Sequence, residues 1–266
     1  MAKREKRNEW IDQKEMKETL LKFFAANNDD MNTFGRTVNQ TFEAFVFSAT
    51  IGWFRQNGWT AEFRHPGRTD TAKQDKELRL KFSTRGKPDQ YSYAICRQGD
   101  NEVHIRHQLR VATNFHDEEL KMPANVCMDV AVIKATDLKN FNSDDYVAND
   151  RLITFGEAKH MTAFAELVAN FVGLVHEMQP HRLKRTVRST DSLSPFLYVS
   201  GFLNRTAQGV EESLRKRGYD LDVYWRTKQL ADACKIPDRP APAKVRKRSK
   251  PAKKATPQPE AESLPF

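Results

Sequence analysis

Three ionisable residues stand inside or at the end of apolar segments. Asp129 lies within the apolar run 126–133, while Glu157 and Lys159 close the strand-like segment that starts at residue 152. A carboxylate in a buried strand is costly unless it is paired, protonated or bound to a cation. Strand side chains two residues apart share a face, so Glu157 and Lys159 lie beside Asp129 if the two strands pair.

Two carboxylates and one lysine at the end of a sheet predict metal-dependent phosphodiester chemistry. Carboxylate oxygens are the ligands that Mg²⁺ and Mn²⁺ prefer. An ammonium group beside them can orient a water or balance charge on a phosphate. We therefore expect Asp129 and Glu157 to hold one or two Mg²⁺ ions, with Mn²⁺ as a substitute, and Lys159 to align the attacking water.

Asp129 followed by Glu157-Ala158-Lys159 resembles the D-x(n)-E-x-K signature of the PD-(D/E)XK nuclease superfamily, which has the restriction-endonuclease-like fold. By element order the resemblance covers roughly residues 36–225. It implies a DNA nuclease in which Asp129, Glu157 and Lys159 are catalytic, the Ala158 carbonyl is a further metal ligand, and Glu43 on the first helix joins the site.

The chain departs from that pattern in two ways. Met128, not Pro, precedes Asp129, and the interval from Asp129 to Glu157 is long for a hairpin, which predicts an inserted loop over 134–150. His104 and His107 have an odd spacing on a strand, so we expect them to face opposite sides and not to share a metal.

Plainer interpretations remain for the same residues. An E-x-K tripeptide is common in charged chains, so the trio could be a structural salt bridge, and Glu43 could be an ordinary polar residue on a helix surface. The chief functional alternative is a catalytically inactive nucleic-acid-binding or partner-docking protein of the same fold. A third is a nuclease acting on RNA or branched DNA.

Basic residues in two polar segments are candidate contacts to nucleic-acid phosphates, which would give salt-sensitive affinity without sequence specificity. The alternative is that these segments are solvated loops. The expected biological role lies in restriction, phage defence, repair or mobile DNA. The candidate residues are Arg64, Arg68, Arg85, Lys87, Arg182, Lys184 and Arg185.

The composition favours a cytoplasmic, globular protein with an acidic partner. Hydrophobic residues make up 39% of the 266 residues, and the formal net charge is +9. Three widely separated cysteines predict neither a disulfide nor a zinc site. No apolar stretch approaches the roughly 20 residues that a membrane span needs, so no membrane contact is expected.

Periodicity predicts an α/β fold in which a central mixed sheet is flanked by helices. Residues 1–35 form an N-terminal helical extension, whose helix over 8–26 carries Trp10, Phe23 and Phe24 as a candidate homodimer contact. The resemblance implies that residues 36–234 form a restriction-endonuclease-like domain. Its expected helices cover 37–57, 162–179 and 206–217, and its expected strands cover 59–64, 91–96, 103–113, 126–133, 152–158, 195–202 and 221–225.

The C-terminal region 235–266 has the composition of a disordered basic tail. It contains seven of the 12 prolines, and from residue 237 onwards it has eight Lys or Arg against three acidic residues. Its last residues, 260–266, look similar to the acidic Pro-Phe tip of bacterial single-stranded-DNA-binding proteins. That likeness suggests a replication or repair partner.

Overall fold

The computed structural model describes residues 17–18, 38–65, 78–117, 119–184 and 193–225. All described residues belong to one compact unit, Met1–Ile236, and the second unit, Pro237–Phe266, contains none. Several predictions fall outside the described residues: most of the helix over 8–26 with its dimer contact, the basic tail with its acidic tip, and the side chains of Arg68 and Arg185.

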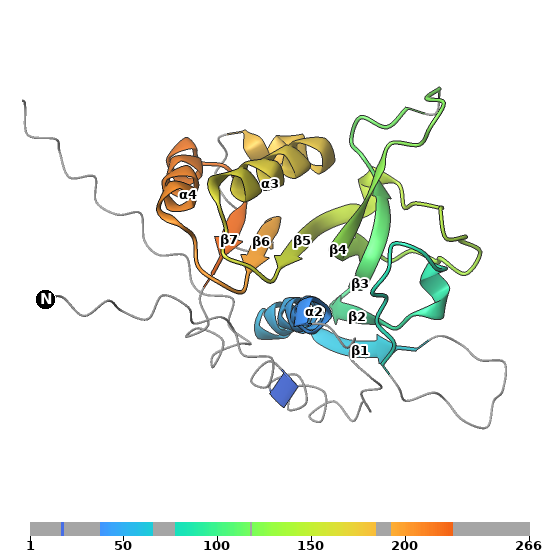
Figure 1. The fold of residues 1–266 in the computed structure, drawn as a ribbon. Helices are drawn as coiled ribbons and strands as arrows, with labels where there is room; N and C mark the ends of the chain where they lie inside the picture. Colours follow the sequence, from blue (N-terminus) through green and yellow to red (C-terminus); the bar gives the residue numbers. More distant parts are fainter. Residues whose placement is uncertain (1–16, 19–37, 66–77, 118, 185–192, 226–266) are drawn as a thin grey trace, which may run out of the picture. The chain divides into compact units, whose positions relative to one another are not determined.

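A seven-stranded mixed sheet forms the centre of the fold and confirms the α/β class (Figure 1). Its spatial order follows the chain from β1 to β7; the first five strands are antiparallel neighbours, whereas β5, β6 and β7 are parallel. Helices connect the parallel strands, as such crossovers require. The strands are β1 (Thr60–Arg64), β2 (Tyr93–Gln98), β3 (Asn101–Ala112), β4 (Asn125–Lys134), β5 (Leu152–Lys159), β6 (Phe196–Val199) and β7 (Asp222–Tyr224).

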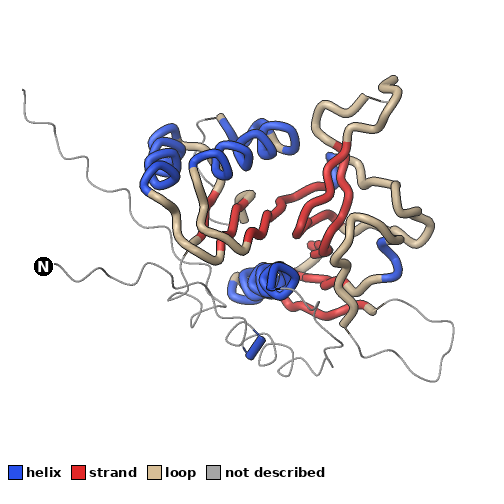
Figure 2. Tube along the Cα trace, in the orientation of Figure 1, coloured by secondary structure: helices blue, strands red, loops and turns tan. Residues whose placement is uncertain are grey.

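Helices cover both faces of this sheet. Helix α2 (Val38–Gln56) lies on one face, and α3 (Ala165–Met178) packs beside α4 (Arg205–Arg217) on the other (Figures 1 and 2). Short 3₁₀ turns at Pro88–Gln90, Asn149–Arg151 and Pro180–Leu183 complete the regular structure of the described residues.

The helix ends follow from local chemistry. The Asn204 side chain accepts the Ala207 N–H at 2.8 Å and caps the start of α4, while Gly218 ends the helix with φ 73°. Helix α3 begins at Ala165, three residues after the start predicted at residue 162. Phe164 occupies the N-cap position, because a bridge between Ala163 and Leu203 keeps the preceding chain extended.

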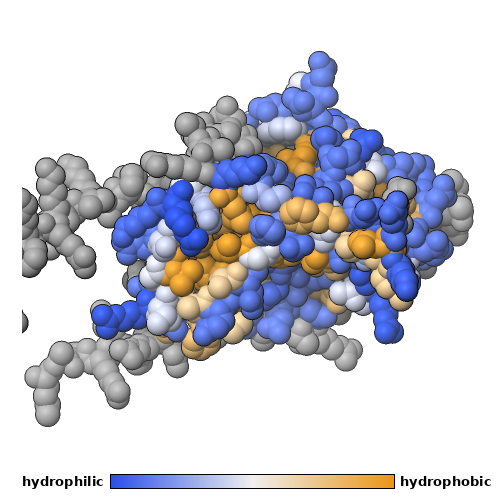
Figure 3. Space-filling view, turned by 90° about the horizontal axis from the view of Figure 1, so that it is seen from above, coloured by the Kyte–Doolittle hydropathy of each residue, from blue (hydrophilic) through white to orange (hydrophobic). Residues whose placement is uncertain are grey.

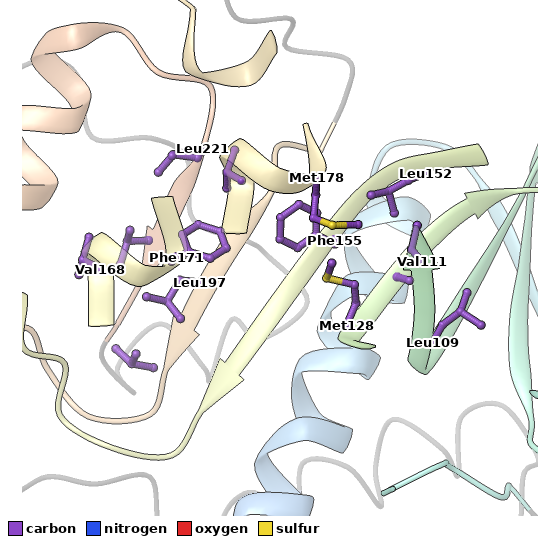
Figure 4. Close-up of a cluster of buried hydrophobic side chains, with 14 of the residues drawn as sticks. Leu109, Val111, Met128, Leu152, Phe155, Val168, Phe171, Met178, Leu197 and Leu221 are labelled. Carbon is purple, nitrogen blue, oxygen red and sulfur yellow. The ribbon is translucent and has the colours of Figure 1, made fainter. Parts of the chain in front are cut away.

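Each face of the sheet has its own hydrophobic core. The first core packs α2 against the sheet, and the second packs the sheet against α3 and α4; Figure 4 shows the second, in which side chains from strands and helices point toward one another. Fully buried aromatic residues anchor both. The first contains Phe42, Phe45, Phe47, Ile105, Val130 and Val132, and the second contains Leu109, Val111, Met128, Phe155, Phe171 and Val175.

In both β3 and β4 the regular alternation of side chains between the two faces of the sheet is interrupted, and the two interruptions lie beside each other. On β3, Ile105 packs in the first core but Leu109 in the second, although regular alternation would keep them on one face. On β4, Val130 and Met128 divide in the same way. The change on β3 occurs at Gln108, which among the described residues is the one non-glycine with positive φ, at 50°.

The outer surface is mixed in polarity. Figure 3 shows hydrophobic residues gathered across the middle of the face seen from above, with hydrophilic residues around them. Exposed large hydrophobic side chains include Phe115, Met122 and Phe164. None of the described helices combines the length and apolar character needed to cross a membrane.

Candidate active site

Asp129 lies where β4 and β5 separate. The two strands pair from Ile133 with Leu152 as far as Val130 with Gly156. At the next position the Asp129 side chain enters the gap, and its Oδ2 accepts the backbone N–H of Ala158 at 2.9 Å. The loop predicted after residue 134 does separate the strands in the chain, so their pairing, and not chain proximity, places Asp129 beside β5.

Lys159 joins the two carboxylates of the motif. Its Nζ donates to Asp129 Oδ2 at 2.8 Å and to Glu157 Oε2 at 2.7 Å. Asp129 and Glu157 are nearly buried, with 11% and 14% of their side chains exposed, whereas 37% of Lys159 is exposed. The structure therefore brings the three side chains together, and the lysine connects the buried pair with solvent.

The electrostatics of the cluster are dominated by its acidic groups. Burial, reinforced by the charge of Asp129, raises the pKa of Glu157 from its ordinary 4.5 to about 7, against the opposing effect of Lys159. Burial alone would lower the pKa of Lys159, but the charges and hydrogen bonds of Glu157 and Asp129 raise it above its ordinary value. The ammonium group therefore stays protonated, while Glu157 titrates near neutrality.

Glu43 reaches the cluster from α2 through Gln108. The Gln108 amide nitrogen donates to Asp129 Oδ1 at 2.9 Å and to Glu43 Oε2 at 3.2 Å. The left-handed backbone of Gln108 costs on the order of 1–3 kcal/mol in a non-glycine residue. That conformation places its amide between a carboxylate of α2 and a carboxylate of β4.

His107 lies against Glu43, although the sequence predicted of this histidine only that it would not share a metal with His104. Its Nδ1 donates to the Lys81 carbonyl at 2.6 Å, and its Nε2 lies 3.3 Å from Glu43 Oε2. One signal was visible in the sequence: Arg106, His107 and Gln108 are three consecutive polar residues between Ile105 and Leu109, and all three are buried. His104 instead pairs with Glu102, so the two histidines do not share a site.

The candidate phosphate contacts differ in availability. Arg64 is exposed beside Glu62 at 3.7 Å, and Arg85, Lys87 and Lys184 are exposed. Arg182 is different: its guanidinium is bound to Asp220 and reaches the Ile153 carbonyl at 3.5 Å, with 14% of its side chain exposed. Arg182 therefore connects β5 with the segment before β7 and is left out of the proposed nucleic-acid contacts.

The carboxylate oxygens of the cluster are suitable ligands for a divalent cation, provided that the cation displaces the groups that now donate hydrogen bonds to them. As they stand, the described residues contain no group of three or more His, Cys, Asp or Glu side chains arranged to hold a metal ion. The ammonium of Lys159 and the amide of Gln108 fill the space between the carboxyl groups. Three carboxyl groups against one ammonium leave an excess of acidic groups, and the raised pKa of Glu157 arises first from burial and then from the charge of Asp129.

The backbone of β5 supplies one more oxygen. The N–H and C=O of one strand residue point to the same side. The Ala158 N–H points to Asp129, and the carbonyl of the next residue, Lys159, points away to the Ser200 N–H at 3.1 Å. The Ala158 carbonyl therefore faces the gap that holds Asp129.

Comparison of the chain with protein-family models, with curated proteins and with solved structures finds no match.

Proposed function

We propose that this chain is a Mg²⁺-dependent nuclease that hydrolyses phosphodiester bonds of DNA, built on a restriction-endonuclease-like core. The single observation that carries the proposal is the contact of Lys159 Nζ with both Asp129 and Glu157 at the point where β4 and β5 separate. A buried carboxylate pair with a partly exposed lysine matches the needs of phosphoryl chemistry better than those of a structural salt bridge, since a salt bridge needs only one acid for one base.

Each residue has a separate task in this proposal. Asp129, Glu157 and the Ala158 carbonyl would hold the cation, which when bound supplies positive charge to the scissile phosphate and lowers the pKa of a bound water. Lys159, released from the carboxylates, orients the attacking water and neutralises charge on the phosphate. Glu43 supports the cluster through the amide of Gln108.

The substrate is proposed to be DNA because of the exposed basic residues. Arg85 and Lys87 lie in one loop and Lys184 in another, and all three side chains are exposed to the solvent from which a backbone phosphate would approach. The sequence also allowed RNA or branched DNA as the substrate. Both are therefore included in the test as a second set of substrates.

The test is nicking of supercoiled plasmid with Mg²⁺, with Mn²⁺ and with EDTA. Asp129→Asn preserves shape and an acceptor for the Ala158 N–H but removes the negative charge, so we expect cleavage to fall by about 10²-fold or more. Glu157→Gln and Lys159→Met should have similar effects. Lys216→Ala removes an exposed lysine of α4 and serves as the matched control.

Two results would count against the proposal. Undiminished cleavage by Asp129→Asn would remove Asp129 from the reaction. Absence of cleavage by the unaltered protein on plasmid, RNA and branched DNA, together with salt-dependent DNA binding, would favour the inactive nucleic-acid-binding alternative.

A further inference from the structure

We propose that His107 and Glu43 hold a divalent cation on the Oδ1 side of Asp129, in a mixed nitrogen and oxygen site that favours a transition-metal ion such as Mn²⁺ over Mg²⁺. The inference deepens the proposed function and rests on it for the role of Asp129. It adds a ligand on β3 and assigns the ion preferred on the Oδ1 side of Asp129, separate from the Mg²⁺ that Asp129, Glu157 and the Ala158 carbonyl would hold.

The hydrogen bonding of His107 leaves one ring nitrogen aimed at Glu43. A carbonyl oxygen only accepts, so Nδ1, at 2.6 Å from the Lys81 carbonyl, carries the proton. In the neutral ring Nε2 is therefore a bare acceptor. It has no hydrogen-bond partner among the described residues, although only 1% of the side chain is exposed. A buried acceptor left in this way is costly.

The partner that Nε2 faces is another acceptor, the Glu43 carboxylate. The two atoms lie 3.3 Å apart without the geometry of a hydrogen bond. Two ligands at about 2.1 Å from one ion, with an angle of about 90–110° between them, lie about 3.0–3.4 Å apart. The observed separation is thus that of two atoms ready to bind the same cation.

The Nδ1 contact has the form that metal-binding histidines use. Such residues donate the second ring N–H to a backbone carbonyl or a carboxylate, which fixes the tautomer and orients the free nitrogen. Phe47 and Phe82 lie edge-on to the His107 ring, at 6.1 and 5.0 Å between centroids, and hold its plane. The ligand is therefore oriented before any ion arrives.

Gln108 marks the place of the third ligand. Its amide nitrogen touches both Glu43 Oε2 and Asp129 Oδ1, and so occupies the space that a cation between these oxygens would take. Its Oε1 accepts the Cys127 thiol at 3.4 Å. Rotation of the amide would open the space and offer this oxygen instead. An imidazole ligand shifts the preference from Mg²⁺, which favours oxygen, to Mn²⁺ and later ions of the series.

The experiment is Mn²⁺ binding to the full chain, measured by calorimetry and by pulsed electron paramagnetic resonance, which detects a nitrogen nucleus bonded to Mn²⁺. We expect a nitrogen coupling in the unaltered protein. His107→Asn keeps a donor for the Lys81 carbonyl but removes Nε2, so it should lose the coupling and weaken Mn²⁺ binding by about 10- to 100-fold. Mg²⁺ binding should weaken less.

His104→Asn is the matched control, because His104 is also buried on β3 but pairs with Glu102, and it should retain the coupling. Bound Mn²⁺ without nitrogen coupling in the unaltered protein overturns the inference whether or not any variant folds. Nicking of plasmid by that same protein would then leave the proposed nuclease standing. Nitrogen coupling without cleavage of any nucleic acid would support the site and reject the nuclease.

Discussion

The Oδ2 atom of Asp129 accepts the backbone N–H of Ala158 at 2.9 Å, so a side chain of β4 takes the place that a backbone carbonyl would fill in a regular ladder. That substitution lets the strands separate immediately after Val130 and Gly156. It also satisfies one oxygen of a carboxylate that is otherwise costly to bury. The same contact that disrupts the sheet therefore stabilises the charged group.

The raised pKa of Glu157 predicts a pH-dependent stability in the absence of divalent ions. Because its folded pKa of about 7 exceeds its ordinary 4.5, the folded state binds more protons between these values. The contribution of Glu157 to the free energy of unfolding is fully present below about pH 4.5 and is lost as pH rises through 7. The total loss is on the order of 3 kcal/mol. Urea unfolding in EDTA at several pH values should show that Glu157→Gln loses this decline. Glu119→Gln, in an exposed loop, should keep the decline. If stability fell with pH in the same way in both variants, the raised pKa of Glu157 would be refuted.

Removing the lysine should expose the repulsion between the acids. In Lys159→Met two nearly buried carboxyl groups lose their shared donor, so we expect the free energy of unfolding at about pH 8 to fall by about 1–3 kcal/mol. At about pH 5 the loss should be smaller, because Glu157 is then protonated, and added Mg²⁺ should restore part of it at pH 8. The melting temperature measures both effects. A loss that is equal at the two pH values would contradict the electrostatic account.

Arg182 and Lys87 should separate into structural and nucleic-acid-binding roles. The Arg182–Asp220 pair is nearly buried, and Ser194 Oγ donates to Asp220 Oδ1 at 2.6 Å, so Arg182→Met should lower the free energy of unfolding by about 3–5 kcal/mol.

Lys87→Ala should leave stability unchanged but lower DNA affinity, and reduce the slope of log affinity against log salt by about 1. Fluorescence anisotropy across salt concentrations tests the second part, and an unchanged slope would remove Lys87 from the interface.

Gly156 should tolerate no side chain. A Cβ at this position would lie 2.2 Å from the Phe196 ring, directly before Glu157 on β5. We expect Gly156→Ala to destabilise the protein by about 1–3 kcal/mol and to reduce nicking by displacing Glu157. In contrast, a Cβ at Gly173 in α3 meets no atom within 4 Å, and Gly173→Ala should stabilise by up to about 1 kcal/mol. Chemical denaturation measures both, and equal effects would argue against the close contact with Phe196.

The sequence by itself determined the elements and the three residues of the motif. Apolar runs and turn residues are local signals, so the described strands and helices appear close to their expected places, including the end of α4 at Arg217. The lone acid in an apolar run identified Asp129, because the cost of burying a charge is a property of the residue and its neighbours in the chain.

Only the tertiary structure showed that His107 and Gln108 join that motif, whereas the resemblance had already implied Glu43. His107 and Gln108 belong to β3, and Glu43 belongs to α2, so their meeting depends on the packing of a helix over the sheet and on the change of face at Gln108. A positive φ in a non-glycine residue has no reliable local signal. Arg182 shows the converse: its charge suggested a surface role, but the pairing with Asp220 arises from a contact 38 residues away along the chain. Long-range contacts of this kind are set by the packing of the whole domain, which no short window of sequence records.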